Sequence, residues 1–334
     1  MSQGGLVLKV ILSVAFLAII STAIGYQQLQ ATLQSPLNIS QSTQFEVKKG
    51  TGFNKLCQQW QAKNWVESCW RYQVIAKLDP TLTDLKAGLY ELSNTSVINN
   101  IKKINQGQQI SFSFTIIEGQ ALRDVLANIE NAPNLNNDLK LDELGKQIIN
   151  EDTLLEGWLF PDTYHYQHND TASSVLKRAA QTMQQTLSDA WQKRANNLPY
   201  STAYEALIMA SIIEKETAVA SERPLIASVF VNRLNTKMRL QTDPTVIYGL
   251  GENFDGDIKY KDLRNHTPYN TYRIDGLPPT PIAMPSKEAI LAAVNPPQSD
   301  YVYFVAKGDG SHQFSTTLKQ HNAAVKTYIL NKKN

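Results

Sequence analysis

The chain of 334 residues contains only two cysteines, Cys57 and Cys69, and no run of basic residues. Its 32 lysines and arginines nearly balance 30 aspartates and glutamates, which gives a formal net charge of +2. Proteins that bind nucleic acid carry a basic stripe or patch, so we expect no nucleic-acid partner. The length suffices for two domains and a sizeable core.

Residue patterns of metal sites and peptide hydrolases are also missing. The sequence contains no C-x-x-C, no cysteine after position 69 and no G-x-S-x-G nucleophile elbow. A peptidase or amidase is therefore disfavoured. His165 and His168 are three positions apart in an expected strand, where such side chains point to opposite faces. We expect no metal site and no cofactor.

Charged residues are absent from the long apolar run between Val10 and Tyr26. With Leu6 to Leu8 in front, this run approaches the roughly 20 residues that cross a bilayer. Lys9 lies on its N-terminal side, and no charge follows until Glu46, so the positive-inside rule places the body of the protein outside the cytoplasm. Residues 1–26 are expected to form a cytoplasmic tip and a single membrane anchor. A cleaved signal peptide is the alternative.

Residues 27–44 are rich in glutamine and serine, which predicts a flexible tether. Residues 45–110 follow as strand, helix, helix and strand, an order that resembles a small LysM-like module of the kind that often holds N-acetylglucosamine polymers. A purely structural spacer is the alternative. Cys57 and Cys69 fall in the two expected helices of this module, where they form either a disulfide or two buried thiols.

Residues 111–334 show a mixed pattern of helices and strands. The overall fold class is therefore α+β: an N-terminal transmembrane helix, a small LysM-like βααβ module and a larger mixed domain. Expected strands cover 111–117, 301–306 and 312–315, and expected helices cover 122–129, 141–149, 173–196 and 287–294. Two further helices are expected to begin at N-cap residues Ser221 and Asp243, the second with Pro244 in its first position.

Glu214 is the leading candidate for chemistry. Thr202 and Glu205 form a capping-box pattern that predicts the start of an apolar helix. Leu207, Ala210 and Glu214 then fall on one face of that helix. Burial disfavours the charged form of a carboxylate, which suits a general acid working near neutral pH. Glu216 points to the opposite side and is the weaker candidate. A structural, ion-paired glutamate is the alternative to a catalytic one.

Several motifs together resemble the YceG-like family of endolytic murein transglycosylases. The resemblance covers nearly the whole chain. The motifs are Glu156–Tyr164 (EGWLFPDTY), Ala210–Thr217 (ASIIEKET), Ser228–Leu234 (SVFVNRL), Leu240–Tyr248 (LQTDPTVIY), Tyr269–Tyr272 (YNTY), Gly276–Ile282 (GLPPTPI), Ala293–Pro296 (AVNP) and Tyr301–Val305 (YVYFV).

The resemblance implies an inner-membrane protein whose body faces the periplasm and cuts nascent peptidoglycan strands. It assigns the catalytic role to Glu214. The expected reaction cleaves the β-1,4 bond between N-acetylmuramic acid and N-acetylglucosamine, leaves 1,6-anhydro ends and limits strand length. Most glycosidases need two carboxylates, whereas this reaction can use one. Expected partners are glycan strands, the inner membrane and penicillin-binding synthases.

The polar and aromatic residues of these motifs are the candidates for binding the sugar strand. Each also has a structural alternative, such as a helix cap, a contact that locks a loop, or core filling. Glu156 and Asp162 are either turn formers or supporting catalytic groups. The candidates for substrate binding are Gln241, Thr242, Asp243, Tyr248, Tyr269, Asn270, Tyr272 and Asn295.

A different class of function also fits the sequence. The chain can be read as a catalytically inactive scaffold that holds glycan beside the wall-synthesis machinery through its small module. Activity on purified glycan strands separates this hypothesis from the enzyme hypothesis.

Overall fold

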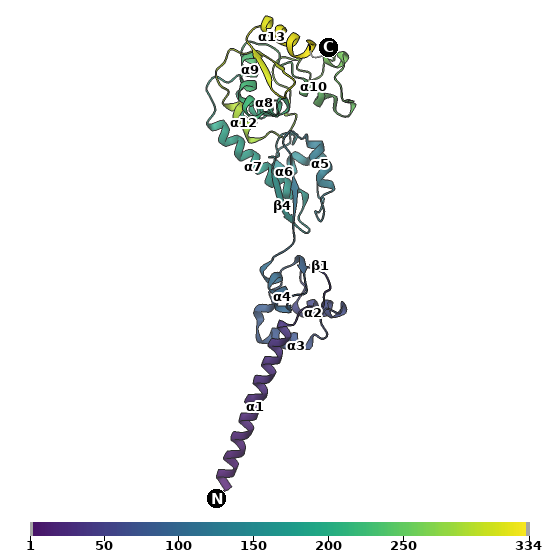
Figure 1. Ribbon diagram of the computed structural model, residues 1–334, viewed down its shortest axis with the longest axis vertical. Helices are drawn as coiled ribbons and strands as arrows, with labels where there is room; N and C mark the ends of the chain where they lie inside the picture. The colour runs from purple at the N-terminus through teal and green to yellow at the C-terminus, as the bar shows by residue number, and fades with distance from the viewer. Residues whose placement is uncertain (1–2, 332–334) are drawn as a thin grey trace. The chain divides into compact units, whose positions relative to one another are not determined.

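The computed structural model describes residues 3–331 (Figure 1). The first two residues of the expected cytoplasmic tip, and residues 332–334 of the expected large domain, lie outside this range. Contacts divide the chain into two compact units. Met1–Phe112 with Gln167–Asn169 form the unit that we call the small domain, which includes the long first helix. Ser113–Tyr166 with Asp170–Asn334 form the large domain.

The small domain follows the predicted order of strand, helix, helix and strand. Its two strands pair antiparallel, with Phe45 opposite Tyr90. This confirms the βααβ arrangement, to which the structure adds a further helix, α4. The elements are α1 (Gln3–Gln34), β1 (Thr43–Val47), α2 (Phe53–Ala62), α3 (Trp70–Leu78), the short η1 (Pro80–Thr83), β2 (Gly88–Leu92) and α4 (Val97–Gln106).

Helix α1 is longer than the sequence suggested, and the expected tether at residues 27–44 is wrong. Residues 27–34 continue α1, because neither proline nor glycine interrupts this stretch before Pro36. Leu33, Leu37 and Ile39 are buried in the core of the small domain. These three apolar side chains, widely spaced among polar residues, anchor a segment whose composition alone indicated a flexible coil.

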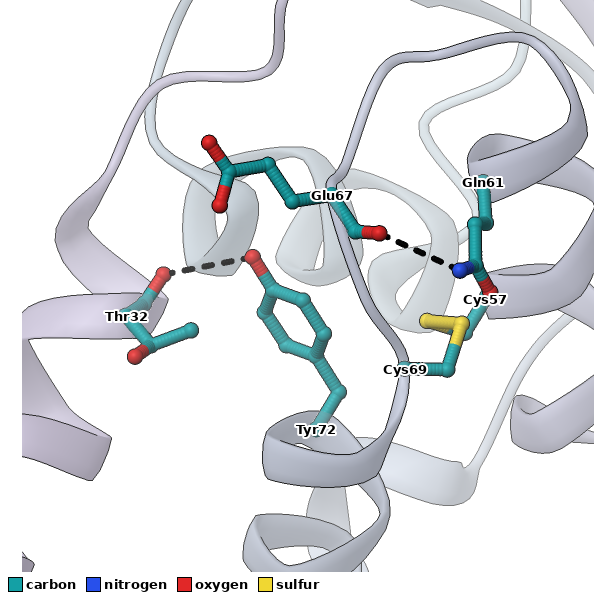
Figure 2. The surroundings of a disulfide bond; sticks show 6 residues. All are labelled: Thr32, Cys57, Gln61, Glu67, Cys69 and Tyr72. Atoms are coloured by element: carbon teal, nitrogen blue, oxygen red, sulfur yellow. Dashed lines mark hydrogen bonds between the residues drawn. A yellow bond between two sulfur atoms is a disulfide. The ribbon is translucent and has the colours of Figure 1, made fainter.

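The two cysteines form a disulfide, which settles the alternative that the sequence left open. Cys57 lies in α2 and Cys69 immediately precedes α3, with their Cα atoms 5.8 Å apart. Figure 2 shows the bond together with two hydrogen bonds that tie the same region. Gln61 Nε2 donates to the Glu67 carbonyl at 3.1 Å, and Tyr72 Oη donates to the Thr32 carbonyl of α1 at 3.5 Å.

Removal of the disulfide is expected to weaken the small domain. Closing a loop of this size restricts the unfolded chain and is worth about 2–3 kcal/mol. The double variant Cys57→Ala/Cys69→Ala should therefore unfold or become protease-sensitive in the small domain at lower denaturant than wild type. Dithiothreitol should act on wild type alone. Equal stability of the oxidised wild type and the double variant would contradict the prediction.

The large domain carries two small two-stranded sheets surrounded by helices. Strand β3 pairs with β4, and β5 pairs antiparallel with β6. The elements are β3 (Ser111–Thr115), α5 (Leu122–Glu130), η2 (Leu141–Glu143), α6 (Leu144–Ile149), β4 (Thr163–Gln167), α7 (Ala172–Gln192), α8 (Ala203–Glu216), η3 (Ala220–Glu222), α9 (Arg223–Asn235), α10 (Asp243–Leu250), η4 (Gly251–Asn253), α11 (Tyr260–Arg264), α12 (Lys287–Val294), β5 (Tyr303–Ala306), β6 (His312–Ser315), α13 (Leu318–Val325) and the π-helical η5 (Lys326–Leu330).

Helix α8 is the centre of the large domain. Every residue from Ala206 to Ile213 is buried, so the helix is covered on all sides rather than along one stripe. Helices α7, α9, α10 and α12 pack against it (Figure 1). The predicted capping box at Thr202 and Glu205 is confirmed, with the two reciprocal bonds at 3.2 and 3.0 Å. The central position of α8 fixes where its last residues lie.

Two predicted helix starts need correction. Ser221 does not cap α9, because η3 precedes it and α9 begins at Arg223 with Pro224 in its first turn. Thr242, rather than Asp243, is the N-cap residue of α10. In both places a proline in the first helical turn marks the start, and the N-cap differs from the predicted residue by one position.

Candidate active site

The Glu214 side chain, at the end of α8, is 6% exposed and is held by two residues. Arg223 Nη2 donates to Oε1 at 2.9 Å. The backbone N–H of Ser286 donates to Oε2 at 3.0 Å, and the Ser286 hydroxyl donates to the same oxygen. The carboxylate is therefore oriented by a cation on one oxygen and by two neutral donors on the other.

The partners of Glu214 come from the first residues of two other helices. Arg223 begins α9, and Ser286 is the N-cap residue of α12. Glu214 thus lies at the N-terminus of α12, where free backbone N–H groups and the helix dipole favour an anion. The sequence placed Glu214 on an apolar face and left an ion-paired glutamate open as the alternative. It named neither partner, since Ser286 lies 72 residues away in the chain.

The bonds to Glu214 leave one acceptor position on Oε1. A carboxylate offers about four lone-pair sites, two on each oxygen. Among the described residues, Ser286 fills both sites of Oε2, and Arg223 fills one site of Oε1. The remaining site on Oε1 can take a proton or accept a hydrogen bond from a sugar hydroxyl.

A second carboxylate, Glu118, shares the same arginine. Glu118 Oε2 lies 3.8 Å from Arg223 Nη2, and its side chain is 52% exposed. Glu118 follows β3 in a loop that is fixed to the segment before α12. The backbone N–H of Gly119 donates to the Met284 carbonyl at 2.9 Å, and the Met284 N–H donates to the Gln120 carbonyl at 2.8 Å.

Glu214, Glu118 and Arg223 line a cleft of about 650 Å³ in the large domain. Its walls come from the end of β3 and the loop after it, from the Pro161–Thr163 turn, and from the end of α8 with Arg223. Two carboxylates and one guanidinium leave this cluster one negative charge in excess. The pKa of Glu118 is raised, first by burial and next by the charge of Glu214. A proton taken up here neutralises the cluster.

Glu216 has different surroundings from Glu214, although it belongs to the same helical turn and also borders the cleft. The Thr242 hydroxyl donates to its Oε1. Burial, with a smaller contribution from the charge of Asp243, raises the pKa of Glu216 to about 7. Glu216 therefore ties α8 to the start of α10.

Glu156 connects three segments of the large domain. It accepts the N–H of Leu122 at 2.9 Å and the hydroxyl of Tyr248 at 2.9 Å. Burial raises its pKa to about 7. Gly157 follows with φ +78°, and a Cβ at that position would lie 2.4 Å from Pro281. Glycine therefore allows this turn to pack directly on the proline-rich segment.

The predicted substrate residues around α10 mostly bind one another. Gln241 adopts a positive φ of 52° and donates its backbone N–H to Thr271. Thr242 is buried and binds Glu216. Asp243 accepts the Tyr272 hydroxyl at 2.6 Å. These contacts hold α10 to the loop at residues 265–276 and leave Gln241 and Asp243 at the surface.

The other four predicted substrate residues also have structural contacts or lie elsewhere. The rings of Tyr248 and Tyr269 are 4.9 Å apart, and Tyr269 exchanges a hydrogen bond with Thr280. The Asn270 amide donates to three backbone carbonyls of its own loop. Asn295 ends α12, at the opposite end of that helix from Ser286.

The structure thus places none of the eight residues among those that line the 650 Å³ cleft around Glu214. Asp162, which the sequence flagged without a firm role, does line it. Among residues 3–331, no group of three or more His, Cys, Asp and Glu side chains is arranged to hold a metal ion.

Comparisons with known proteins agree with the family resemblance that the sequence motifs indicated. The model of the YceG-like family matches residues 45–327. The chain belongs to the YceG-like family. A relative from Bacillus subtilis, named endolytic murein transglycosylase, is 35% identical over 268 residues, which cover 74% of each chain. A relative of the same name from Streptococcus pneumoniae is 28% identical over 97% of this chain and 66% of its own length.

A solved structure shares the fold of this YceG-like chain. The crystal structure of a YceG-like protein from Listeria monocytogenes matches with a TM-score of 0.54 and 30% identity. The match covers 85% of this chain and 99% of the other.

Three residues of the site were missed by the sequence reasoning. Arg223 and Glu118 carry no local pattern that points to Glu214, because only the fold brings them together. Ser286 did have a signal. A serine directly before an expected helix is typical of an N-cap, and the open end of such a helix attracts a carboxylate.

Buried Glu156 should make the large domain less stable as the pH rises. Its pKa is raised from 4.5 to about 7, so between these values the folded state keeps a proton that the unfolded state releases. Stability therefore falls with rising pH across this window, by at most about 1.4 kcal/mol per pH unit for one group. Thermal unfolding of wild type and Glu156→Gln, compared from pH 5 to pH 8, tests this.

The variant Glu156→Gln should show a shallower loss of stability above pH 5, because glutamine stays neutral and still accepts from Tyr248. Some dependence will remain, since the raised pKa of Glu216 acts in the same window. Glu130→Gln, a change at an exposed glutamate of α5, is the matched control and should keep the wild-type slope. A slope in Glu156→Gln equal to that of the control would contradict the argument.

Proposed function

We propose that this chain is an endolytic lytic transglycosylase of peptidoglycan, with Glu214 as its acid–base group. The observation that carries the proposal is the Glu214 carboxylate, which Arg223 and Ser286 orient at a cleft of about 650 Å³, with one acceptor site open on Oε1. The names of the relatives from Bacillus subtilis and Streptococcus pneumoniae support the choice of substrate.

In the first step, a protonated Glu214 donates its proton from Oε1 to the glycosidic oxygen. The bond between C1 of N-acetylmuramic acid and O4 of N-acetylglucosamine breaks, and the proton leaves with the O4 hydroxyl. Arg223 and Ser286 hold the carboxyl group in place, so the proton transfer occurs from a fixed position.

In the second step, the 6-hydroxyl of the same N-acetylmuramic acid attacks C1, and Glu214 accepts its proton. The product carries a 1,6-anhydro ring, the carboxyl group is protonated again, and no water is consumed. One carboxylate therefore suffices, in contrast to hydrolases that need a pair. Water must be kept from the opposite face of the sugar for this ring closure to win.

Glu216 is the second candidate for the acid, and its pKa of about 7 favours it. We prefer Glu214 because the Thr242 hydroxyl already binds Glu216 and ties it to α10, whereas the cluster of Glu214, Arg223 and Glu118 borders the cleft from two sides. The family resemblance also assigns the role to Glu214.

We further propose that the eight candidate substrate residues have different roles. Gln241 and Asp243 lie at the surface beside Glu216 and would meet the glycan beyond the cleft. Buried Thr242 and Asn270 act by holding the loop that carries them. Tyr248, Tyr269 and Tyr272 would stiffen the same wall, and Asn295 would contact a more distant part of the strand.

Helix α1 is proposed to anchor the enzyme in the inner membrane, with both domains in the periplasm. Its segment Val7–Gln34 is apolar enough to cross a bilayer, a property that it shares with signal sequences. We prefer a retained anchor because α1 continues into the core of the small domain through Leu33. Penicillin-binding synthases, which make the strands, are the proposed protein partners.

Glu214→Gln is expected to abolish cleavage of purified glycan strands without loss of the fold. Glutamine keeps the shape and one of the two acceptor oxygens, but it cannot exchange the proton. The loss should be at least about a hundredfold to ten-thousandfold in rate. Release of muropeptides, with thermal unfolding measured in parallel, provides the test.

Glu216→Gln is the matched control, because it makes the same chemical change about half a turn along α8 and keeps an acceptor for Thr242. It should retain most of the activity. An active Glu214→Gln protein together with an inactive Glu216→Gln protein would move the acid role to Glu216. Absence of any activity in wild type would instead favour the scaffold hypothesis.

Cleavage inside the strands should give fragments of intermediate length early in the reaction. Long uncrosslinked strands are digested, and the products are separated by length and analysed by mass spectrometry. The expected ends are 1,6-anhydro-muramoyl groups, which are lighter than reducing ends by one water. Mainly disaccharides at the first time points would mean cutting from the ends, and reducing muramic ends would mean hydrolysis.

A further inference from the structure

Helix α3 of the small domain exposes an apolar stripe. Trp70, Val74 and Leu78 follow one another at intervals of four residues and therefore share one face of the helix. They are 58%, 38% and 65% exposed, respectively. The opposite face of α3, with Tyr72 and Ile75, is buried in the core. Burying large apolar side chains is favourable, so a stripe of three indicates a partner surface.

This stripe lies next to the point at which α1 enters the small domain. Tyr72 of α3 donates to the carbonyl of Thr32 in α1, as Figure 2 shows. Trp70 lines a hollow of about 1100 Å³ whose other wall includes Gln28, Ala31 and Thr32 of α1. In Figure 1, α3 is drawn beside the C-terminal end of α1.

The depth of this region follows from the length of α1. The apolar run ends at Tyr26, an aromatic residue of the kind that marks a membrane interface. With a helix rise of about 1.5 Å per residue, Gln28 lies about 3 Å and Thr32 about 9 Å beyond it. The head-group layer on one side of a bilayer is about 5–8 Å thick. Gln28, which lines the same hollow as Trp70, is therefore at head-group depth, and Thr32 lies at the outer edge of this layer.

The charges beside the stripe suit the same location. The Arg71 guanidinium lies 5.3 Å from the centre of the Trp70 ring, and Lys77 is in the last turn of α3. Cations near an anionic bilayer surface each contribute about 1 kcal/mol of attraction. Glu67, which also borders the hollow, opposes them by one charge.

We propose that the Trp70–Val74–Leu78 stripe of α3 rests on the outer head-group layer of the same membrane that α1 crosses. The small domain is then seated on the bilayer at two places, α1 and α3, and its rotation about α1 is restricted. The occupant of the stripe is the lipid surface, because α3 lies directly beside the membrane exit of α1. This inference rests on the anchor proposed above and is independent of the catalytic assignment.

Quenching of tryptophan fluorescence by brominated lipids tests the proposal. The full-length protein is reconstituted in nanodiscs of phosphatidylethanolamine and phosphatidylglycerol, with or without bromine on the acyl chains near the head group. Wild type should lose part of its emission in the brominated discs. Trp70→Phe should lose most of that quenching, whereas Trp191→Phe, the matched change in the large domain, should keep it.

A second pair of variants leaves Trp70 in place. Leu78→Glu places a charge on the stripe and should reduce the quenching of Trp70. Gln58→Glu, which introduces the same charge at an exposed position of α2, should leave quenching unchanged. Both positions are exposed, so folding is not at risk.

Quenching that is absent in wild type, or equal in wild type and Trp70→Phe, would overturn the proposal. Unchanged quenching in Leu78→Glu would likewise overturn the seating of α3. Loss of quenching on addition of soluble glycan fragments would show that a sugar strand, rather than lipid, occupies the surface. A protein that fails to enter the discs would overturn the proposed anchor as well. None of these outcomes bears on the proposed catalytic role of Glu214.

Discussion

The junction at Glu214 is the interaction on which the large domain and its cleft depend. One carboxylate joins the end of α8 to the starts of α9 and α12 through Arg223 and Ser286. Removing either partner would leave one oxygen of a largely buried charge without its donor, which costs more than the net worth of the lost bond. The same junction serves the proposed chemistry, because it fixes the direction in which the remaining acceptor site of Oε1 points.

Acidic residues of the large domain occur in two kinds of surroundings, an ion-paired cluster at the cleft and buried positions beside hydroxyl groups. Glu214 and Glu118 share one guanidinium at the cleft, where their combined charge changes with a single proton. Glu156 and Glu216 are buried among hydroxyl donors, Tyr248 and Thr242, and each has a pKa raised to about 7. A raised pKa alone therefore does not separate the candidates, since Glu216 also borders the cleft. The proposed assignment to Glu214 rests on its cluster with Arg223 and Glu118 and on the family resemblance.

Local sequence patterns predicted those parts of the fold that local physics determines. The capping box at Thr202 and Glu205 marks a helix start correctly because capping is a short-range interaction. The βααβ order of the small domain was also predicted. The tether was not, because Leu33 and Leu37 become core residues only once the small domain provides the rest of that core.

The candidate site was predicted in part. Glu214 is where the helix-face argument placed it, but its partners come from positions that only the fold brings together. The motif residues from Gln241 to Tyr272 mostly bind one another. A motif rich in polar and aromatic residues can therefore serve to hold a loop in place as well as to bind sugar. Sequence spacing cannot separate these two uses, since both require the same polar and aromatic side chains.

The most direct test of the account is a crystal structure of the Glu214→Gln protein with a bound glycan strand. The account predicts that the strand lies in the cleft bordered by Glu118 and Asp162. Its scissile glycosidic oxygen should be within hydrogen-bond distance of the substituted side chain at position 214. A strand whose scissile bond lies instead beside Glu216, or outside the cleft altogether, would contradict it.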